Sequence, residues 1–283
     1  MAVIQDNYII IGSLVSAVVT APAPATETAA SSVQAAQRWR YCVHTADLPG
    51  IDNIVVAADG HIYATQELSD GQGRVVRLRD NGPETVLGDL NRADGLFTRG
   101  QHLYVTEEMP EGRVIRIDLR GGAPQELARL HKPEGIDMLA DGDLIVSEDS
   151  MNGRVVRIKR NGMVETMMGG LNRPEGIAVA KDGTIYVAET ATGRVLAYKS
   201  GDVRTVVNDL DEPDQVELAP DGALWITEDA KPGRLMRYKD GSLAVVLSGL
   251  LEPQGIAFLN NGAVLVAEQA RGRILAVMPA ALP

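Results

Sequence analysis

A segment of about 40 residues recurs six times along this chain of 283 residues, and this repetition constrains the fold more than any other feature. Two of the copies read "LHKPEGIDMLADGDLIVSED" and "LNRPEGIAVAKDGTIYVAET". The copies open at Leu48, Leu90, Leu130, Leu171, Leu210 and Leu250. The arginine of a "GR" pair recurs with the same period, at Arg74, Arg113, Arg154, Arg194, Arg234 and Arg273. Because so short a unit cannot bury its apolar surface alone, the copies must pack against one another.

Each copy divides into four short strands. In the fourth copy, "GIAVA", "TIYVAE", "RVLAYK" and "VRTVVND" are apolar or alternating runs separated by turn signals, and no helical period occurs. A "DG" or "NG" pair, which tolerates the positive φ of a tight hairpin, joins the first two strands in five copies. These pairs are Asp59-Gly60, Asp141-Gly142, Asp182-Gly183, Asp221-Gly222 and Asn261-Gly262. The pattern therefore predicts four-stranded antiparallel units.

Six such units arranged radially form a β-propeller. The sixth copy ends after "GRILAVM" without a fourth strand, while "RWRYCVHTAD" at residues 38–47 precedes the first copy and has no unit of its own. This strand would complete the last blade and leave no free edge. We therefore predict an all-β, six-bladed propeller in one domain, residues 38–283. Cys42, the single cysteine, lies in the closing strand, where we expect it to be buried and unreactive.

Residues 1–37 differ from the repeats. An apolar run, Tyr8–Val19, is too short for a comfortable membrane span but suits the core of a signal peptide, and Ala23–Ala25 offers an A-x-A cleavage site. The segment before the run contains no lysine or arginine, so a weak membrane anchor and an uncleaved tail remain alternatives. We predict a periplasmic or secreted protein whose folded domain is not embedded in a membrane.

The charge of the chain limits its partners. A net charge of −11 would be repelled by a nucleic-acid backbone, so no nucleic-acid partner is expected. Metal ions, small molecules and neutral or basic protein surfaces remain. With 45% hydrophobic but only 4% aromatic residues, the core must consist of aliphatic side chains on pleated sheets.

Two positions of the repeat are acidic in five of the six copies and carry glutamine in the remaining one. One ends the second strand, at Gln66, Glu107, Glu148, Glu189, Glu228 and Glu268, shortly before the repeated arginine. A carboxylate that binds the arginine fork would tie two strands of a blade together, which explains this set without any function.

The other position begins the first strand, at Asp52, Asp94, Glu134, Glu175, Asp214 and Gln254. First strands line the channel of a propeller, so these side chains should converge at one channel mouth. They could cap backbone amides at the strand starts. Alternatively they could bind a divalent cation, above all Ca²⁺, which takes six to eight oxygen ligands.

This pattern resembles the gluconolactonase and senescence-marker-protein family, with paraoxonases and diisopropyl fluorophosphatase as more distant relatives. The phrase "RPEGIAVAKDGTIYVAETATGRV" is also similar to an NHL repeat, a scaffold for binding as well as for catalysis. In the hydrolases of this group the first-strand position carries metal ligands. "ADG" at Ala93–Gly95 is similar to the segment with the family's ligand-and-base aspartate, and Asp52-Asn53 is similar to a calcium-binding pair of paraoxonases. The chain departs from the family by offering carboxylates where asparagine is common.

The resemblance implies a metal-dependent hydrolase of lactones or related esters acting on a small molecule. The implied ligands are Asp52, Asn53, Asp94, Glu134, Glu175 and Asp214. The cation would polarise a carbonyl group, and Asp94, or failing that Asp214, would take a proton from water. His131 in "LHKPEG" could assist, although a loop histidine is commonly just solvated.

A non-catalytic NHL-type propeller is the alternative. Its rim would bind a protein or a small ligand, and any cation would be structural. The short predicted rim loops, such as "TATG" and "EMPEG", favour this alternative because they leave little material for a deep pocket. The acidic ring favours the hydrolase.

Overall fold

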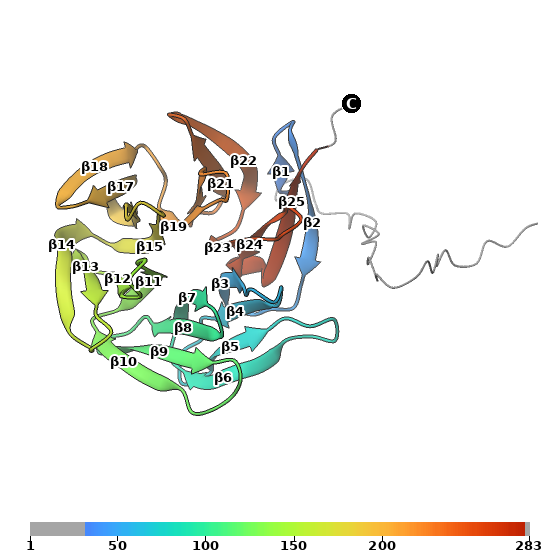
Figure 1. Ribbon diagram of the computed structural model, residues 1–283. Coiled ribbons are helices and arrows are strands. Elements are labelled where there is room, and N and C mark those ends of the chain that lie inside the picture. The colour runs from blue at the N-terminus through green and yellow to red at the C-terminus, as the bar shows by residue number, and fades with distance from the viewer. Residues whose placement is uncertain (1–31, 281–283) are drawn as a thin grey trace, which may run out of the picture.

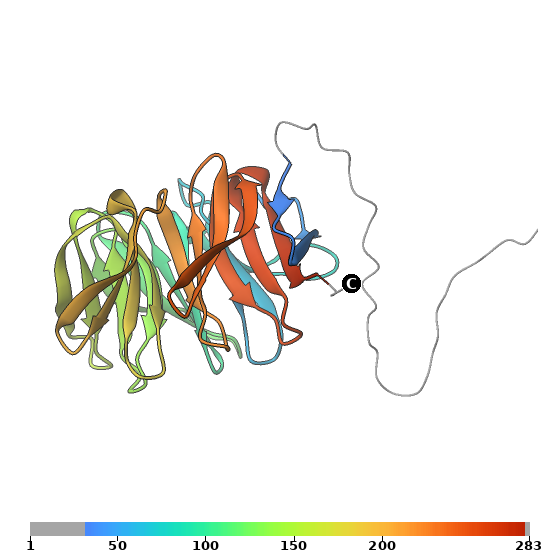
Figure 2. The same cartoon turned by 90° about the horizontal axis from the view of Figure 1, so that it is seen from above.

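The computed structural model describes residues 32–280, and six antiparallel sheets stand around a central channel (Figure 1). Turned by 90°, the molecule shows strands that run along the channel axis (Figure 2). The first strands of the six blades contact one another in a closed circle. The predicted six-bladed, all-β propeller is therefore confirmed. The apolar run Tyr8–Val19 and the cleavage candidate Ala23–Ala25 lie outside the described residues.

Blades 1 to 3 follow one another along the chain. Blade 1 comprises β3 (Ile51–Val56), β4 (Ile62–Gln66), β5 (Gly73–Arg77) and β6 (Glu84–Leu90). Blade 2 comprises β7 (Ala93–Arg99), β8 (His102–Glu107), β9 (Gly112–Asp118) and β10 (Gln125–Leu130). Blade 3 comprises β11 (Pro133–Met138), β12 (Leu144–Glu148), β13 (Met151–Ile158) and β14 (Val164–Asn172).

Blades 4 to 6 complete the circle. Blade 4 comprises β15 (Pro174–Val179), β16 (Ile185–Glu189), β17 (Arg194–Lys199) and β18 (Asp202–Val207). Blade 5 comprises β19 (Pro213–Leu218), β20 (Leu224–Glu228), β21 (Gly233–Lys239) and β22 (Ser242–Leu250). Blade 6 comprises β23 (Pro253–Phe258), β24 (Val264–Glu268) and β25 (Arg273–Pro279), and its outer strand is β2 (Trp39–Thr45).

The closure by β2 was predicted and is confirmed. β2 pairs antiparallel with β25, with Trp39 opposite Pro279. Cys42 on β2 is half-buried rather than fully buried as expected, because β2 is an outer strand. A second short strand, β1 (Gln34–Ala35), precedes residue 38 and pairs with β22 of blade 5. Val33 beside it packs into the core between blades 5 and 6. The N-terminal segment thus contacts both blades at the seam.

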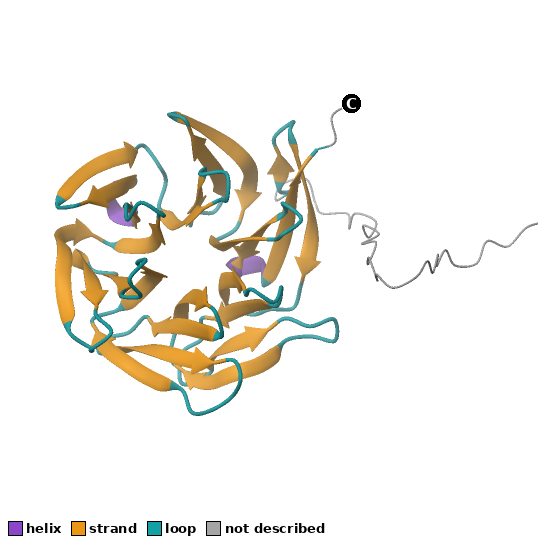
Figure 3. Ribbon diagram, in the orientation of Figure 1, coloured by secondary structure: helices purple, strands orange, loops and turns teal. Residues whose placement is uncertain are grey.

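The hairpin turns confirm the role of the "DG" and "NG" pairs. At Asp59-Gly60, Asp59 Oδ1 accepts a hydrogen bond from the His61 amide at 3.0 Å, and Gly60 has a φ of +85°. The same bond recurs in blades 3 to 6. Helical structure in the described chain is limited to two 3-10 turns, η1 (Thr190–Thr192) and η2 (Gln269–Arg271), seen in Figure 3. No helix of the described residues is long and apolar enough to span a membrane.

The core lies between the blades. Six clusters of buried aliphatic residues each join two neighbouring sheets, as where Val75 and Leu90 of blade 1 meet Leu96 and Leu103 of blade 2. Polar ties supplement this packing. The arginine near the start of each third strand contacts the residue that ends the second strand, as predicted. The pairs are Arg74 with Gln66, Arg113 with Glu107, Arg154 with Glu148, Arg194 with Glu189, Arg234 with Glu228 and Arg273 with Glu268.

Candidate functional site

A ring of acids surrounds the channel mouth. We call it the inner ring, and it consists of Asp52, Asp94, Glu134, Glu175, Asp214 and Gln254. In every blade the ladder between the first and second strands shifts register just after the first residue, at the acid and the residue that follows it. Such an irregularity lets a side chain leave the normal alternation of a strand. Asp214 is half-buried, and the other five members are only 2–8% exposed.

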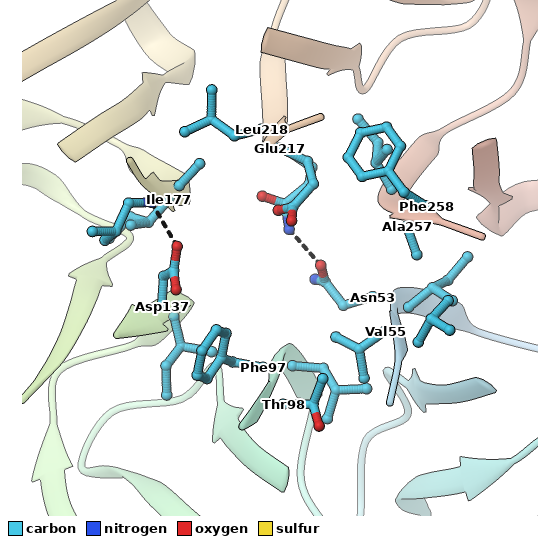
Figure 4. Close-up of a pocket in the computed structure, with 18 residues that line it drawn as sticks. Asn53, Val55, Phe97, Thr98, Asp137, Ile177, Glu217, Leu218, Ala257 and Phe258 are labelled. Atoms are coloured by element: carbon cyan, nitrogen blue, oxygen red, sulfur yellow. Dashed lines mark hydrogen bonds between the residues drawn. The ribbon is translucent and has the colours of Figure 1, made fainter. Parts of the chain in front are cut away.

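The residue after each inner-ring member determines how closely the blades approach. It is glycine in four blades, and a Cβ atom there would collide with the next blade. At Gly135 it would strike the carbonyl oxygen of Glu175. The other two blades carry Asn53 and Gln215, whose amides meet across the channel in a hydrogen bond from Gln215 Nε2 to Asn53 Oδ1 (Figure 4). We call this contact the amide plug, because it lies directly below the inner ring.

A second ring, which the sequence reasoning missed, lies just outside the first. We call it the outer ring, and it consists of Glu67, Glu108, Asp149, Thr190, Asp229 and Gln269. Each member directly follows the residue that ends a second strand. Its amide donates to the carbonyl of a residue with positive φ, as Glu108 does to Arg92 at 2.9 Å. The sequence does contain a signal. In blades 2, 3 and 5 a second acid directly follows the glutamate that binds the arginine, as "EE", "ED" and "ED".

Carboxylate oxygens of the two rings gather in three clusters. The clusters are Asp52, Glu67 and Asp94; Glu108, Glu134 and Asp149; and Glu134, Glu175 and Asp214. Within each cluster one oxygen of every residue lies within 4.8 Å of the others. Two ligands of one Ca²⁺ ion, each at about 2.4 Å, can be at most about 4.8 Å apart. All three clusters therefore have the spacing of a possible cation site.

Cations neutralise the outer-ring side of blades 1 to 4. Arg92 forms ion pairs with Glu67 and Glu108, and Lys132 bonds to Glu108 at 3.0 Å. Arg173 bonds to Asp149 at 3.1 Å and also contacts Glu175. The equivalent positions of blades 5 and 6 are acidic, at Glu212 and Glu252. On that side of the rim Lys231 forms an ion pair with Glu252, so cations are fewer there but not absent from the described residues.

Amide donors satisfy the first cluster. Asp52 accepts hydrogen bonds from Asn53 Nδ2 and Gln269 Nε2, both at 2.9 Å, and Gln269 also donates to Glu67 at 3.0 Å. Among the described residues, Asp94 accepts only a long bond of 3.4 Å, from Asn53. Asn53 donates to two acids, and its side-chain oxygen accepts from Gln215. It therefore orients the acids, and its oxygen is engaged rather than free to bind a cation.

The cluster of Glu134, Glu175 and Asp214 has the fewest donors. Glu175 accepts from Thr190 and Arg173, but the carboxylates of Glu134 and Asp214 accept no hydrogen bond from any described residue. Burial and then repulsion by Glu175 raise the pKa of Glu134 and of Asp214 well above the usual range. Burial is also the main reason why the pKa of Glu175 is raised to about 8.

The donor set fits a divalent cation. Three carboxylates at suitable spacing, two of them lacking any donor, form a site in which negative charge is costly unless protons or a cation compensate it. Burial likewise raises the pKa of Asp94 well above the usual range, with repulsion from Asp52 and Glu67 adding to it. Oxygen ligands of this kind suit Ca²⁺ or Mg²⁺ rather than a softer metal.

The structure brings five of the six predicted metal ligands into these clusters, and Asn53 lies beside them. His131 is not among them. It is exposed, and only its backbone amide is engaged, in a bond to Glu148 Oε1 at 3.1 Å. The outer-ring acids Glu67, Glu108 and Asp149 were not predicted, although they complete two of the three clusters.

The fold and the site place the chain among six-bladed propellers with an acidic channel mouth. Comparisons with known proteins identify the family. The model of the SMP-30/gluconolactonase/LRE-like region matches residues 21–213. The chain belongs to this family, since the match covers more than half of its length. The resemblance stated from the sequence is therefore confirmed. A search of curated proteins finds no match.

Solved structures share the fold at low sequence identity. A gluconolactonase from Xanthomonas campestris is 16% identical with a TM-score of 0.74, covering 93% of this chain and 99% of that chain. An auxiliary nutrient binding protein from Bacteroides thetaiotaomicron is 11% identical with a TM-score of 0.68, covering 82% and 69%. Virginiamycin B lyase from Staphylococcus aureus, in a catalytically inactive form with quinupristin, is 15% identical with a TM-score of 0.61, covering 87% and 99%. These proteins differ in activity, so they support the fold alone.

Proposed function

We propose that the chain is a divalent-metal-dependent hydrolase of lactones or related esters, with Ca²⁺ as the cation and the inner ring as its site. Membership of the gluconolactonase family supports the reaction class. The observation that carries the proposal is the cluster of Glu134, Glu175 and Asp214, whose oxygens lie within 4.8 Å of one another while two of the three carboxylates have no donor. A small lactone is the substrate proposed for this site.

The division of roles follows from the hydrogen bonds. Glu134, Glu175 and Asp214 would hold the cation, which when bound polarises a carbonyl group and lowers the pKa of water. Asp94 lies beside this cluster but outside it, and the one hydrogen bond that it accepts from the described residues is long. Burial raises its pKa, and a more basic carboxylate is the better acceptor of a proton from water, which it would then return to the leaving alkoxide. Asp214, the second candidate base, would be occupied as a ligand.

The other residues of the mouth position these groups. Asn53 and Gln269 donate to Asp52 and keep this carboxylate turned toward the rings. Arg173 and Thr190 fix Glu175. A catalytic role of His131 stays a prediction, since its side chain contacts none of these residues.

Hydrolysis of simple aliphatic and sugar lactones, followed by acid release, tests the proposal. The full chain with Ca²⁺ should release acid, chelator should abolish the release, and Asp94→Asn should lower kcat about 100-fold or more while the variant still binds Ca²⁺. Asp202→Asn, on an exposed strand far from the mouth, is the control and should have the activity of the natural chain. Activity that resists chelator, or that survives in Asp94→Asn, would contradict the assignment.

A non-catalytic binding propeller is the second candidate. The loops that follow the second strands are short, such as Ser150 alone between Asp149 and β13, so no described segment covers the rings. If Ca²⁺ binds but no lactone or ester is hydrolysed, a ligand or a protein partner on the rim becomes the better account.

We also propose export to the periplasm or the medium, on the sequence of residues 8–25. Sequencing the N-terminus of the mature protein tests this. A start shortly after Ala25 would support export, whereas an intact Met1 would contradict cleavage.

A further inference from the structure

Below the amide plug the channel contains a cavity of about 280 Å³. The middle and end of each first strand line it, whereas the inner ring lies at the strand starts, so the cavity lies on the far side of Asn53 and Gln215 from the inner ring. Most of the residues in its wall are apolar, but the polar groups of Asn53, Thr98, Asp137, Gln215 and Glu217 contribute the larger share of its surface. Phe97, Leu218 and Phe258 lie around it, as the close-up shows. Nothing in the proposed hydrolase uses this cavity.

One position of the repeat breaks the apolar pattern of this wall. The fifth residue of the first strand lines the cavity in all six blades, and these residues are Val55, Phe97, Asp137, Ala178, Glu217 and Ala257. Four blades place an apolar residue there, as packing alone would require. Blades 3 and 5 place a carboxylate instead, and the small Ala178 of blade 4 leaves space between them. An apolar residue would cost less at either position.

The two carboxylates differ in their partners. Asp137 is held by two backbone amides at 2.6 Å, from Met138 and from Val179 of the next blade. Glu217 turns into the cavity and forms no hydrogen bond or ion pair with any described residue. Burial raises the pKa of Asp137 to about 6, and burial together with repulsion by Asp137 raises the pKa of Glu217 well above the usual range. A cation between them would relieve both penalties.

We propose that this cavity binds a small organic ammonium ion, which donates hydrogen bonds to Glu217 and Asp137 while its apolar part packs against Phe97, Leu218 and Phe258. A primary ammonium group supplies the donors that Glu217 lacks. Aromatic faces attract an organic cation as well. The two carboxylates supply at most four oxygens, fewer than the six to eight that Ca²⁺ takes. The volume is at the small end for ligand pockets, so the amine must be small.

2-Phenylethylamine is the probe, with 2-phenylethanol as a neutral compound of the same body. Isothermal titration of the full chain should show saturable binding of the amine, and at least about tenfold weaker binding of the alcohol. Glu217→Gln keeps the shape of the side chain but removes the group that can become a carboxylate beside the amine, and should weaken binding of the amine about tenfold or more. The fold should tolerate this change, since the Glu217 carboxyl group forms no hydrogen bond or ion pair with any described residue. Unfolding of the variant by urea checks this.

Two further measurements separate this site from the inner ring. The amine should bind Asp94→Asn as it binds the natural chain, and saturating Ca²⁺ should not displace it. Because Glu217 must lose a proton to pair with the amine, the observed enthalpy should vary with the ionisation enthalpy of the buffer. No binding of the amine, equal binding in Glu217→Gln, or displacement by Ca²⁺ would each overturn the proposal. The proposal does not rest on the hydrolase activity.

Discussion

Gln215 donates a hydrogen bond across the channel to Asn53, and these two amides stand where four other blades have glycine (Figure 4). The contact joins blades 1 and 5, which are not neighbours. It lies between the acidic mouth and the cavity of the lower channel, which Asn53 and Gln215 also line. The other four blades all carry glycine at this position, so the pair breaks the sixfold repetition of the channel wall.

Removal of this plug should cost stability. Gln215→Ala leaves the Asn53 oxygen in the channel without its donor, so we expect the free energy of unfolding to fall by about 1–3 kcal/mol. Unfolding in urea measures it. Gln72→Ala, in an exposed loop, is the matched control and should change stability little. Equal effects of the two changes would show that the plug contributes nothing.

The close approach of the first strands predicts an asymmetric response to alanine. Gly135→Ala places a Cβ atom against the Glu175 carbonyl, so the two strands must separate, at a cost of about 1–3 kcal/mol or more. Gly88→Ala meets only the Thr85 methyl group at 3.7 Å. Urea unfolding of the two variants compares like with like, because neither glycine has a positive φ. A neutral Gly135→Ala would contradict the packing described for the channel.

The arginine ties should differ in strength between blades. Arg194→Leu leaves the fully buried Glu189 without its guanidinium, whereas Arg74→Leu leaves the neutral Gln66. An exposed pair contributes at most about 1 kcal/mol and a buried one that loses a partner costs about 3–5 kcal/mol. Arg194 is partly exposed, so we expect a loss of about 2 kcal/mol, and a smaller loss for Arg74→Leu. Thermal and urea unfolding check the order, and the reverse order would refute it.

The pH dependence of the metal-free chain follows from the inner ring. The pKa of Glu175 is about 8 in the fold, above its unfolded value, because burial disfavours the charged form. The folded chain therefore holds protons that the unfolded chain has released. The associated stability is fully present below about pH 4 and is lost as the pH rises through about 8.

Urea unfolding in chelator, at intervals from about pH 5 to pH 8, should thus show stability that falls as the pH rises. Glu175→Gln should flatten the slope, and saturating Ca²⁺ should flatten it in the natural chain. Stability that rises over this range in chelator would contradict the raised pKa values.

Most of the fold could be predicted from the sequence because its signals are local and repeated. The turn at Asp59-Gly60 and the alternation of the strands recur in copy after copy, and the surplus strand at residues 38–47 matched a missing one. β1 could not be predicted, because a two-residue strand in a segment rich in alanine and serine has no periodicity to detect. Its pairing with β22 depends on the assembled seam.

The candidate site was predicted in part. The inner ring was visible because each acid opens a first strand. Glu67, Glu108 and Asp149 were missed because alternation suggests that a residue beside a tying glutamate faces away. The strand ends there, and a backbone bond to a residue with positive φ turns the chain toward the rim instead. Glu217 and Asp137 were invisible for a different reason, since only the closed circle brings their blades together.

Metal content and thermal unfolding of the full chain test the central claim, that the inner ring binds a divalent cation. We predict about one divalent ion per chain. Ca²⁺ at 100 times its Kd should stabilise the folded chain by about 2.7 kcal/mol, and the melting temperature should fall correspondingly when chelator removes it. The double variant Glu134→Gln, Asp214→Asn should lose both the ion and the response to chelator, while Asp202→Asn keeps them. The account would be contradicted if the purified chain contained no metal and its melting temperature changed neither with chelator nor with added Ca²⁺.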